Sequence, residues 1–483
     1  MEGIKSSLLS FGKVELNTVL ITVFLSVLVL ISLIFGNNLM VFLVALILAA
    51  IFIWKSPQAG LLAALLTTMI FGEHFSLLPI QFREVVYKIY ALDFVVLITF
   101  VFWLLKSPVH SITKIDWKAK KNAWLLVFLG FILLNVVRSF LMSSDLTLAL
   151  GTFKNYIYAL LYFLVILIVD SKEKLLRFFK VFLWGGVVLL VFVLYGMLTG
   201  SGLWSEVTPG IRYLSGLHAY YLTFSLIILL VLLVYKKYLW GYTHTLVLFL
   251  FQLAGMVGGM FRHLWLGFLT AGAVIVSWLG FKQKKNFVKL SLMIILTVII
   301  LLIGVLWATG LIGSDYNFLQ DKFVQSIWGR GRTLLQRGYS VESAVGWRLE
   351  TWRVALDKFL SNPAFGIGFG KKFFFEYRGF IDFVDIRNIH NDFASLLVQM
   401  GILGFLPFLL FNIYNVRDLF KVLKSRDVFY KPISLMLLGF YIIAVFGIFF
   451  AIYIMFNGTS VFYWTIMALI SALVNSEKRK VKN

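Results

Sequence analysis

The residues best suited to chemistry lie in one polar segment of an otherwise apolar chain, residues 362–411. A helix must stop at Asn362, because the residue before a proline is pushed out of the α region. Residues 366–370 then carry three glycines, and His390-Asn391-Asp392 precedes a long apolar run. Asn391 or Asp392 is a good N-cap for that run. His390 is therefore predicted at the mouth of a membrane helix, where the helix dipole favours a phosphate group.

Two chemical roles suit His390. A neutral imidazole near pH 7 can take a proton from a hydroxyl group. A protonated imidazole can instead bind phosphate, whose negative charge raises the pKa of the ring. A lone histidine at a helix start is more often a cap or an interface residue, but here a polar loop precedes it and an N-cap follows it. We favour the base and keep the phosphate ligand as the alternative.

Three arginines are candidates for binding phosphate, because the planar guanidinium fork matches phosphate oxygens. Arg262 follows two glycines and precedes an apolar run, Arg212 lies in a polar loop, and Arg348 lies on an amphipathic stretch. Each has a structural alternative: Arg262 snorkels to the interface, Arg212 is solvated, and Arg348 contacts anionic headgroups. Arg138 and Lys154, near the ends of two apolar runs, are predicted to snorkel.

Metal, nucleotide and thiol chemistry find little support in the sequence. There is no cysteine, and the six histidines form no H-x-x-H pair. The glycines at 366–370 follow a helix stop rather than a strand, which predicts a tight backbone turn and not a dinucleotide site. The carboxylates near the polar segment form no D-x-D pair and are expected to pair with Lys and Arg; they are Glu342, Glu350, Glu376, Asp382, Asp385 and Asp392.

The composition indicates a membrane protein. The chain has 483 residues, of which 61% are hydrophobic and 14% charged, whereas a soluble domain is closer to half apolar and a quarter charged. The formal net charge of +22 would suit a nucleic-acid partner. We attribute it instead to the excess of Lys and Arg in the cytoplasmic loops of membrane proteins.

Apolar runs of spanning length predict an all-α polytopic fold with about 14 transmembrane helices. The runs cover residues 17–35, 39–54, 58–72, 91–105, 123–142, 147–169, 181–200, 217–235, 243–260, 262–281, 288–309, 391–414, 433–453 and 455–474. Alternate loops hold most of the Lys and Arg, which predicts cytoplasmic N- and C-termini. The chain then divides into helices at 1–309, a long outer loop segment at 310–390, and helices with a cytoplasmic tail at 391–483.

The outer loop segment is far longer than a typical connection between helices, and such loops are usually functional or disordered. Within it, residues 347–360 have apolar side chains at helical spacing. We predict a helix lying on the outer membrane surface, with its tryptophans at headgroup level.

The polar segment and its surroundings resemble the O-antigen ligase/polymerase superfamily. The matching stretches are SNPAFGIGFG, HNDFASLLVQMGILG and WRLETWRVALDKFL, with GGMFRHLWLGF and, more loosely, PGIRYLSGLHAYY further upstream. Members are bacterial membrane glycosyltransferases that move glycan from undecaprenyl diphosphate to an acceptor on the outer face of the inner membrane.

The resemblance implies roles for the candidate residues. Arg262, Arg212 and Arg348 would hold the diphosphate of the lipid-linked donor, and His390 would activate the acceptor hydroxyl. It also implies an inverting reaction without metal or other cofactor, and no nucleic-acid partner. We favour a polysaccharide polymerase, because ligases of this superfamily tend to have fewer spans, and keep an O-antigen ligase as the alternative. Two alternative functions come from other classes of protein: a lipid-linked oligosaccharide flippase and a glycan-binding component of the cell envelope.

Overall fold

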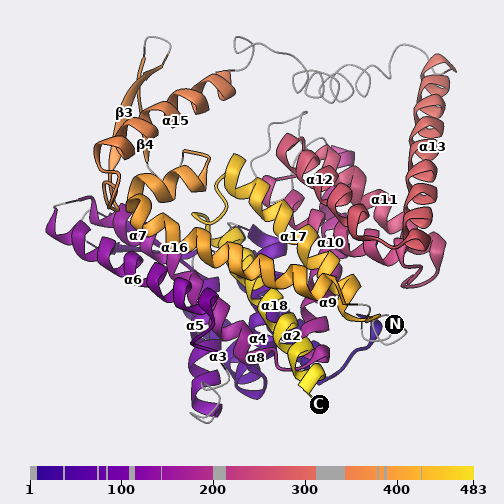
Figure 1. Ribbon diagram of the computed structural model, residues 1–483, viewed down its shortest axis with the longest axis horizontal. Helices are drawn as coiled ribbons and strands as arrows, with labels where there is room; N and C mark the ends of the chain where they lie inside the picture. The colour runs from indigo at the N-terminus through magenta and orange to yellow at the C-terminus, as the bar shows by residue number, and fades with distance from the viewer. Residues whose placement is uncertain are drawn as a thin grey trace. The chain divides into compact units, whose positions relative to one another are not determined.

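A computed structural model gives the fold, which is mostly helical (Figure 1). It describes residues 8–35, 39–72, 76–82, 85–107, 115–142, 144–199, 214–311, 343–377, 380–385, 389–425 and 427–482. The chain forms two compact units, and each is described by itself. The first comprises residues 1–10, 176–337 and 426–443, and the second comprises residues 11–175, 338–425 and 444–483.

The first unit is built from helices. α10 is its centre, because every residue from His218 to Val234 is buried. Close packing around α10 depends on glycines on its neighbours: a Cβ at Gly186 would lie 2.3 Å from Ser225, and one at Gly439 would lie 2.7 Å from Ile227. The helices that contribute are α9 (Lys172–Thr199), α10 (Gly216–Val234), α11 (Tyr242–Gly258), α12 (Arg262–Trp278), α13 (Phe281–Leu311) and most of α17 (Tyr430–Phe450).

The second unit combines long and short helices with two β-hairpins. Its helices are α2 (Lys13–Phe35), α3 (Leu39–Lys55), α4 (Pro57–Phe71), α5 (Ala91–Lys106), α6 (Lys120–Leu141), α7 (Leu146–Ile157), the 3₁₀ turn η3 (Tyr158–Leu160), α8 (Leu161–Ile168), α15 (Ser343–Ser361), α16 (Asp392–Leu423) and α18 (Asn457–Lys482). α16 packs against α6 and against α18, so it links these two helices within the unit (Figure 1).

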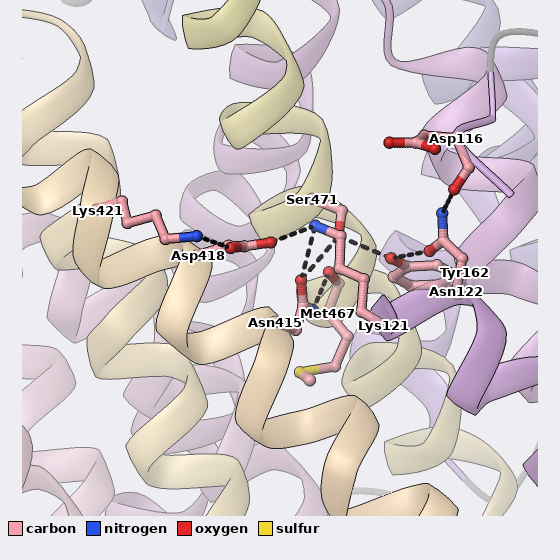
Figure 2. Close-up of polar contacts among 9 residues, drawn as sticks. All are labelled: Asp116, Lys121, Asn122, Tyr162, Asn415, Asp418, Lys421, Met467 and Ser471. Atoms are coloured by element: carbon pink, nitrogen blue, oxygen red, sulfur yellow. Dashed lines mark hydrogen bonds and ion pairs between the residues drawn. The ribbon is translucent and has the colours of Figure 1, made fainter. Parts of the chain in front are cut away.

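A buried polar network joins α6, α8, α16 and α18 (Figure 2). The Lys121 ammonium lies 3.4 Å from a carboxylate oxygen of Asp418, and Asn415 accepts a hydrogen bond of 2.7 Å from the Ser471 hydroxyl. Tyr162 contacts Ser471 at 2.8 Å. Polar groups removed from water are retained when they satisfy one another, and truncating one partner of such a pair is strongly destabilising. The network therefore holds the four helices in register.

Eight helices in the described part of the chain are long and apolar enough to cross a membrane. They are Lys13–Phe35, Lys120–Leu141, Leu146–Ile168, Lys172–Thr199, Gly216–Val234, Asp392–Leu423, Tyr430–Phe450 and Gly458–Lys480. α3, α4 and α11 are apolar but of 17 residues or fewer. The helical polytopic prediction is confirmed, while the number of about 14 spans and the outer location of residues 310–390 stay predictions.

Two short antiparallel hairpins accompany the helices. One pairs β1 (Ser76–Phe82) with β2 (Val85–Tyr90), and the other pairs β3 (Lys372–Tyr377) with β4 (Phe380–Asp385). In β3, Phe373 and Phe375 are buried whereas Phe374 is 67% exposed. This alternation is the period of a strand with one face against a core. The sequence predicts a loop for this segment, and the structure has a hairpin there instead.

Candidate active site

The junction between α15 and α16 brings two of the predicted site residues together. α15 carries Arg348 and ends at Ser361, directly before Asn362-Pro363, as the helix stop predicted. Ala355 of α15 is buried against Phe373, Phe375 and Ile389. The chain that leads to His390 is thus held against α15 by an apolar cluster.

The two tryptophans of α15 face protein groups. The Trp352 indole N–H donates a 2.8 Å hydrogen bond to the carbonyl of Ile389. The Trp347 ring lies 5.9 Å from the Phe375 ring and 6.2 Å from the His390 ring, centroid to centroid. The location of these tryptophans at headgroup level stays a prediction. The side chains exposed on this helix include Leu349, Leu356 and Leu360.

His390 is half-buried at the start of α16 in an uncommon backbone conformation. Its φ is +54°, in the left-handed region where few residues other than glycine are found. The next residue, Asn391, caps the helix, with its side chain accepting a 3.0 Å hydrogen bond from the Ala394 N–H. Burial, and secondly the charge of Arg348, lower the pKa of His390 from 6.5 to about 4. The ring is therefore neutral at pH 7 and able to accept a proton.

Asp392 fixes the start of α16 to the segment between α17 and α18. One carboxylate oxygen accepts hydrogen bonds from the backbone N–H groups of Tyr453, at 2.7 Å, and Ile454. The side chain is 1% exposed. We expected this carboxylate to pair with Lys or Arg, and that expectation is wrong: backbone donors take the place of a cation. Glu350 does behave as expected, because its carboxylate pairs with Arg353.

α16 is broken at Gly401, nine residues after it begins. Gly401 has φ +63° and ψ −172°, which lie outside the helical region. The break frees carbonyls of the first half of the helix and N–H groups of the second. Backbone groups of residues 363–368 form hydrogen bonds with these freed groups. The Ile367 N–H donates to the Val398 carbonyl at 2.8 Å, and the Ile402 N–H donates to the Pro363 carbonyl at 2.8 Å. The glycine-rich turn is thus hydrogen-bonded to both halves of a broken membrane helix.

Glycine is required where the turn and the broken helix meet. A Cβ on Gly366 would lie 2.5 Å from the carbonyl oxygen of Val398, and one on Gly401 would lie 2.2 Å from that of Ala364. Both glycines also have positive φ. The prediction of a tight backbone turn is confirmed. Residues 402–423 alone measure ~33 Å as a helix, enough to cross a hydrocarbon core of ~30 Å.

Arg138, at the end of α6, holds this turn in place. Its guanidinium donates to the carbonyls of Phe365 at 2.7 Å and Gly366 at 3.2 Å. Ser139 donates to the Phe369 carbonyl at 3.1 Å. Snorkelling was predicted for Arg138, and the structure instead gives it protein carbonyls as partners. A single cation in the last turn of an apolar helix was the only signal in the sequence. Lys154 was also expected to snorkel. Its ammonium forms an ion pair with a carboxylate oxygen of Asp93 at 2.6 Å.

The other two predicted arginines belong to other parts of the chain. Arg262 is half-buried as the first residue of α12, in the first unit, after Met260 with φ +57°. Arg212 lies outside the described residues. No group of three or more His, Asp and Glu side chains suited to a metal ion occurs in the described ranges. The site in the second unit therefore consists of His390 and Arg348 on the scaffold of α15, α16 and the turn.

The long apolar helices define a multi-pass membrane protein, and the histidine and arginine at the α15–α16 junction give it a cationic polar site. Residues 247–409 match the family model described as O-antigen ligase. This match, over about a third of the chain, supports the resemblance to the O-antigen ligase/polymerase superfamily and supports a membrane enzyme of this type. The matched residues include Arg262, Arg348 and His390 and leave out Arg212. A search of curated proteins gave no match.

Proposed function

We propose that this protein transfers glycan from undecaprenyl diphosphate to an acceptor glycan on the outer face of the inner membrane, as a surface-polysaccharide polymerase. The observation that carries the proposal is the neutral His390 beside Arg348 at the start of α16, within the part of the chain that matches the ligase family. A base and a fixed cation, side by side, are what transfer from a diphosphate leaving group requires.

In the proposed reaction, the acceptor hydroxyl attacks the anomeric carbon of the donor sugar while the bond from that carbon to the diphosphate oxygen breaks. His390 takes the hydroxyl proton, and undecaprenyl diphosphate leaves with the electron pair. Attack opposite the leaving group inverts the anomeric centre. Arg348, with Arg262 and Arg212, stabilises the charge that grows on the diphosphate. The arginines supply this charge stabilisation without a metal ion.

The test is transfer by the purified protein in lipid nanodiscs, supplied with a lipid-linked glycan alone or together with a second acceptor. A polymerase extends the lipid-linked glycan without a second acceptor. A ligase transfers only when a lipid A core or another terminal acceptor is present, and this outcome would replace the polymerase by its alternative. His390→Ala is the matched negative control. Wild-type protein that moves lipid-linked glycan across vesicles without any transfer would be a flippase, and the proposal would fail.

A further inference from the structure

We propose that Arg138 is a positioning residue for the active site: it keeps the turn at residues 362–370 docked in the break of α16, and so fixes His390 relative to Arg348. The consequence for turnover rests on the proposed function, while the positioning itself does not. Arg138 belongs to α6 and reaches the site only through backbone carbonyls of the turn.

The turn is the point at which the two site-bearing helices meet. On one side it continues directly from α15, which carries Arg348. On the other side the Ile367 and Gly368 N–H groups donate to Val398 and Gln399, at 2.8 and 3.0 Å, in the first half of α16. That half-helix begins two residues after His390. Displacing the turn therefore moves the two site-bearing helices relative to each other.

Arginine suits this task because two parallel N–H groups of one planar fork reach two successive carbonyls, those of Phe365 and Gly366. Asn135, one turn earlier on α6, accepts a third hydrogen bond of 3.3 Å from the same guanidinium and limits its rotation. Lysine offers a point charge on a flexible stem and cannot hold both carbonyls in fixed geometry. A cation that only anchored α6 to lipid headgroups would be replaceable by lysine.

The kinetic experiment compares wild type with Arg138→Ala and Arg138→Lys, and uses Arg353→Ala, an exposed arginine on α15, as the matched control. We expect Arg138→Ala to lower kcat about 10²-fold, the order expected when reacting groups are displaced by about 1 Å, with the donor KM unchanged. Arg138→Lys should recover only part of the loss. Because Arg348 helps to lower the pKa of His390, separating the two should move the acid limb of the pH profile to higher pH in Arg138→Ala. The control should match wild type in both measurements.

The second measurement is independent of activity. The protein has no cysteine, so spin labels at Leu356→Cys on α15 and Ile402→Cys just after the break report the distance between the two elements. Both positions are exposed. We expect a narrow distance distribution with Arg138 and a broadened or shifted one in Arg138→Lys, which keeps the charge if the alanine variant does not fold.

An unchanged distribution in the variants overturns the proposal, whether or not the wild type transfers glycan. A donor KM that rises while kcat stays constant also overturns it, because Arg138 would then bind substrate. If wild type shows no transfer but the distance distribution is broadened in Arg138→Lys, the proposed function is refuted and the positioning role of Arg138 stands.

Discussion

The low pKa of His390 makes a pH-dependence prediction that an ordinary histidine would not. An unperturbed imidazole titrates near 6.5, whereas burial and Arg348 bring the pKa of His390 to about 4. The difference corresponds to about 3 kcal/mol in favour of the neutral ring. If His390 is the base, only the neutral form reacts, and kcat/KM follows the neutral fraction in the free enzyme.

The magnitude follows from these two pKa values. At pH 5 about nine-tenths of His390 remains neutral, so kcat/KM should differ by less than about twofold from its value at pH 7. An ordinary histidine would be only a few per cent neutral at pH 5, and kcat/KM would fall about 25-fold. Arg348→Met removes the positive neighbour, which raises the pKa of His390 and moves the fall in rate to higher pH. Diphosphate binding also raises this pKa, so kcat should fall at a higher pH than kcat/KM.

The assay is the initial rate of glycan transfer in nanodiscs from pH 4 to 8 for wild type, His390→Ala and His390→Arg, together with donor binding at each pH. We expect His390→Ala to lower transfer about 10²- to 10⁴-fold while the donor still binds. His390→Arg should not restore transfer, because arginine cannot accept a proton. Recovery in His390→Arg, or donor binding lost in step with the rate, would refute the base and leave His390 as a phosphate ligand.

Four further outcomes are expected. Arg262→Lys should lower transfer about 10²-fold and Arg262→Ala further, measured as kcat and donor KM, because a point charge replaces a bidentate fork. Transfer should persist in EDTA; activity that is lost and then restored by Mg²⁺ would contradict the metal-independent proposal. Gly401→Ala should lower Tm by several degrees, since it places a Cβ 2.2 Å from a carbonyl oxygen at positive φ, whereas Gly130→Ala, with open space around it, should be neutral or slightly stabilising. Asp418→Asn should cost about 3–5 kcal/mol of stability by leaving a buried lysine without its carboxylate, while Lys421→Ala, at an exposed lysine, should have little effect in the same denaturation experiment.

The features set by local sequence were predictable. Asn391 caps α16 because its side chain reaches an N–H three residues ahead, and Pro363 ends α15 through the backbone of the preceding residue. The apolar runs identified the membrane helices because a helix of about twenty consecutive apolar residues matches the thickness of the hydrocarbon core. His390 was singled out by the cap that follows it, and its proximity to Arg348 followed from the resemblance.

The features set by distant parts of the chain were not predictable. Gly401 reads as an ordinary small residue in an apolar helix, and only its docking against Ala364 explains its left-handed backbone. Arg138 looks like any cation at a helix end until the turn supplies it with carbonyls 227 and 228 positions away. The inward-facing tryptophans of α15 depend in the same way on the hairpin and on Ile389, which lie later in the chain.

The break in α16 also bears on how the protein is made. α6 leaves the ribosome first, the turn at residues 362–370 much later, and α16 last. Until the turn docks, the backbone groups on either side of Gly401 lack their protein partners, and any of them that is buried away from water costs free energy. The helix is therefore completed by chain that was translated earlier, and we expect its assembly to be coupled to the docking of the turn. Variants that weaken the turn are expected to expose the incompletely assembled helix to membrane proteases, and so to lower the amount of protein in the cell as well as its turnover.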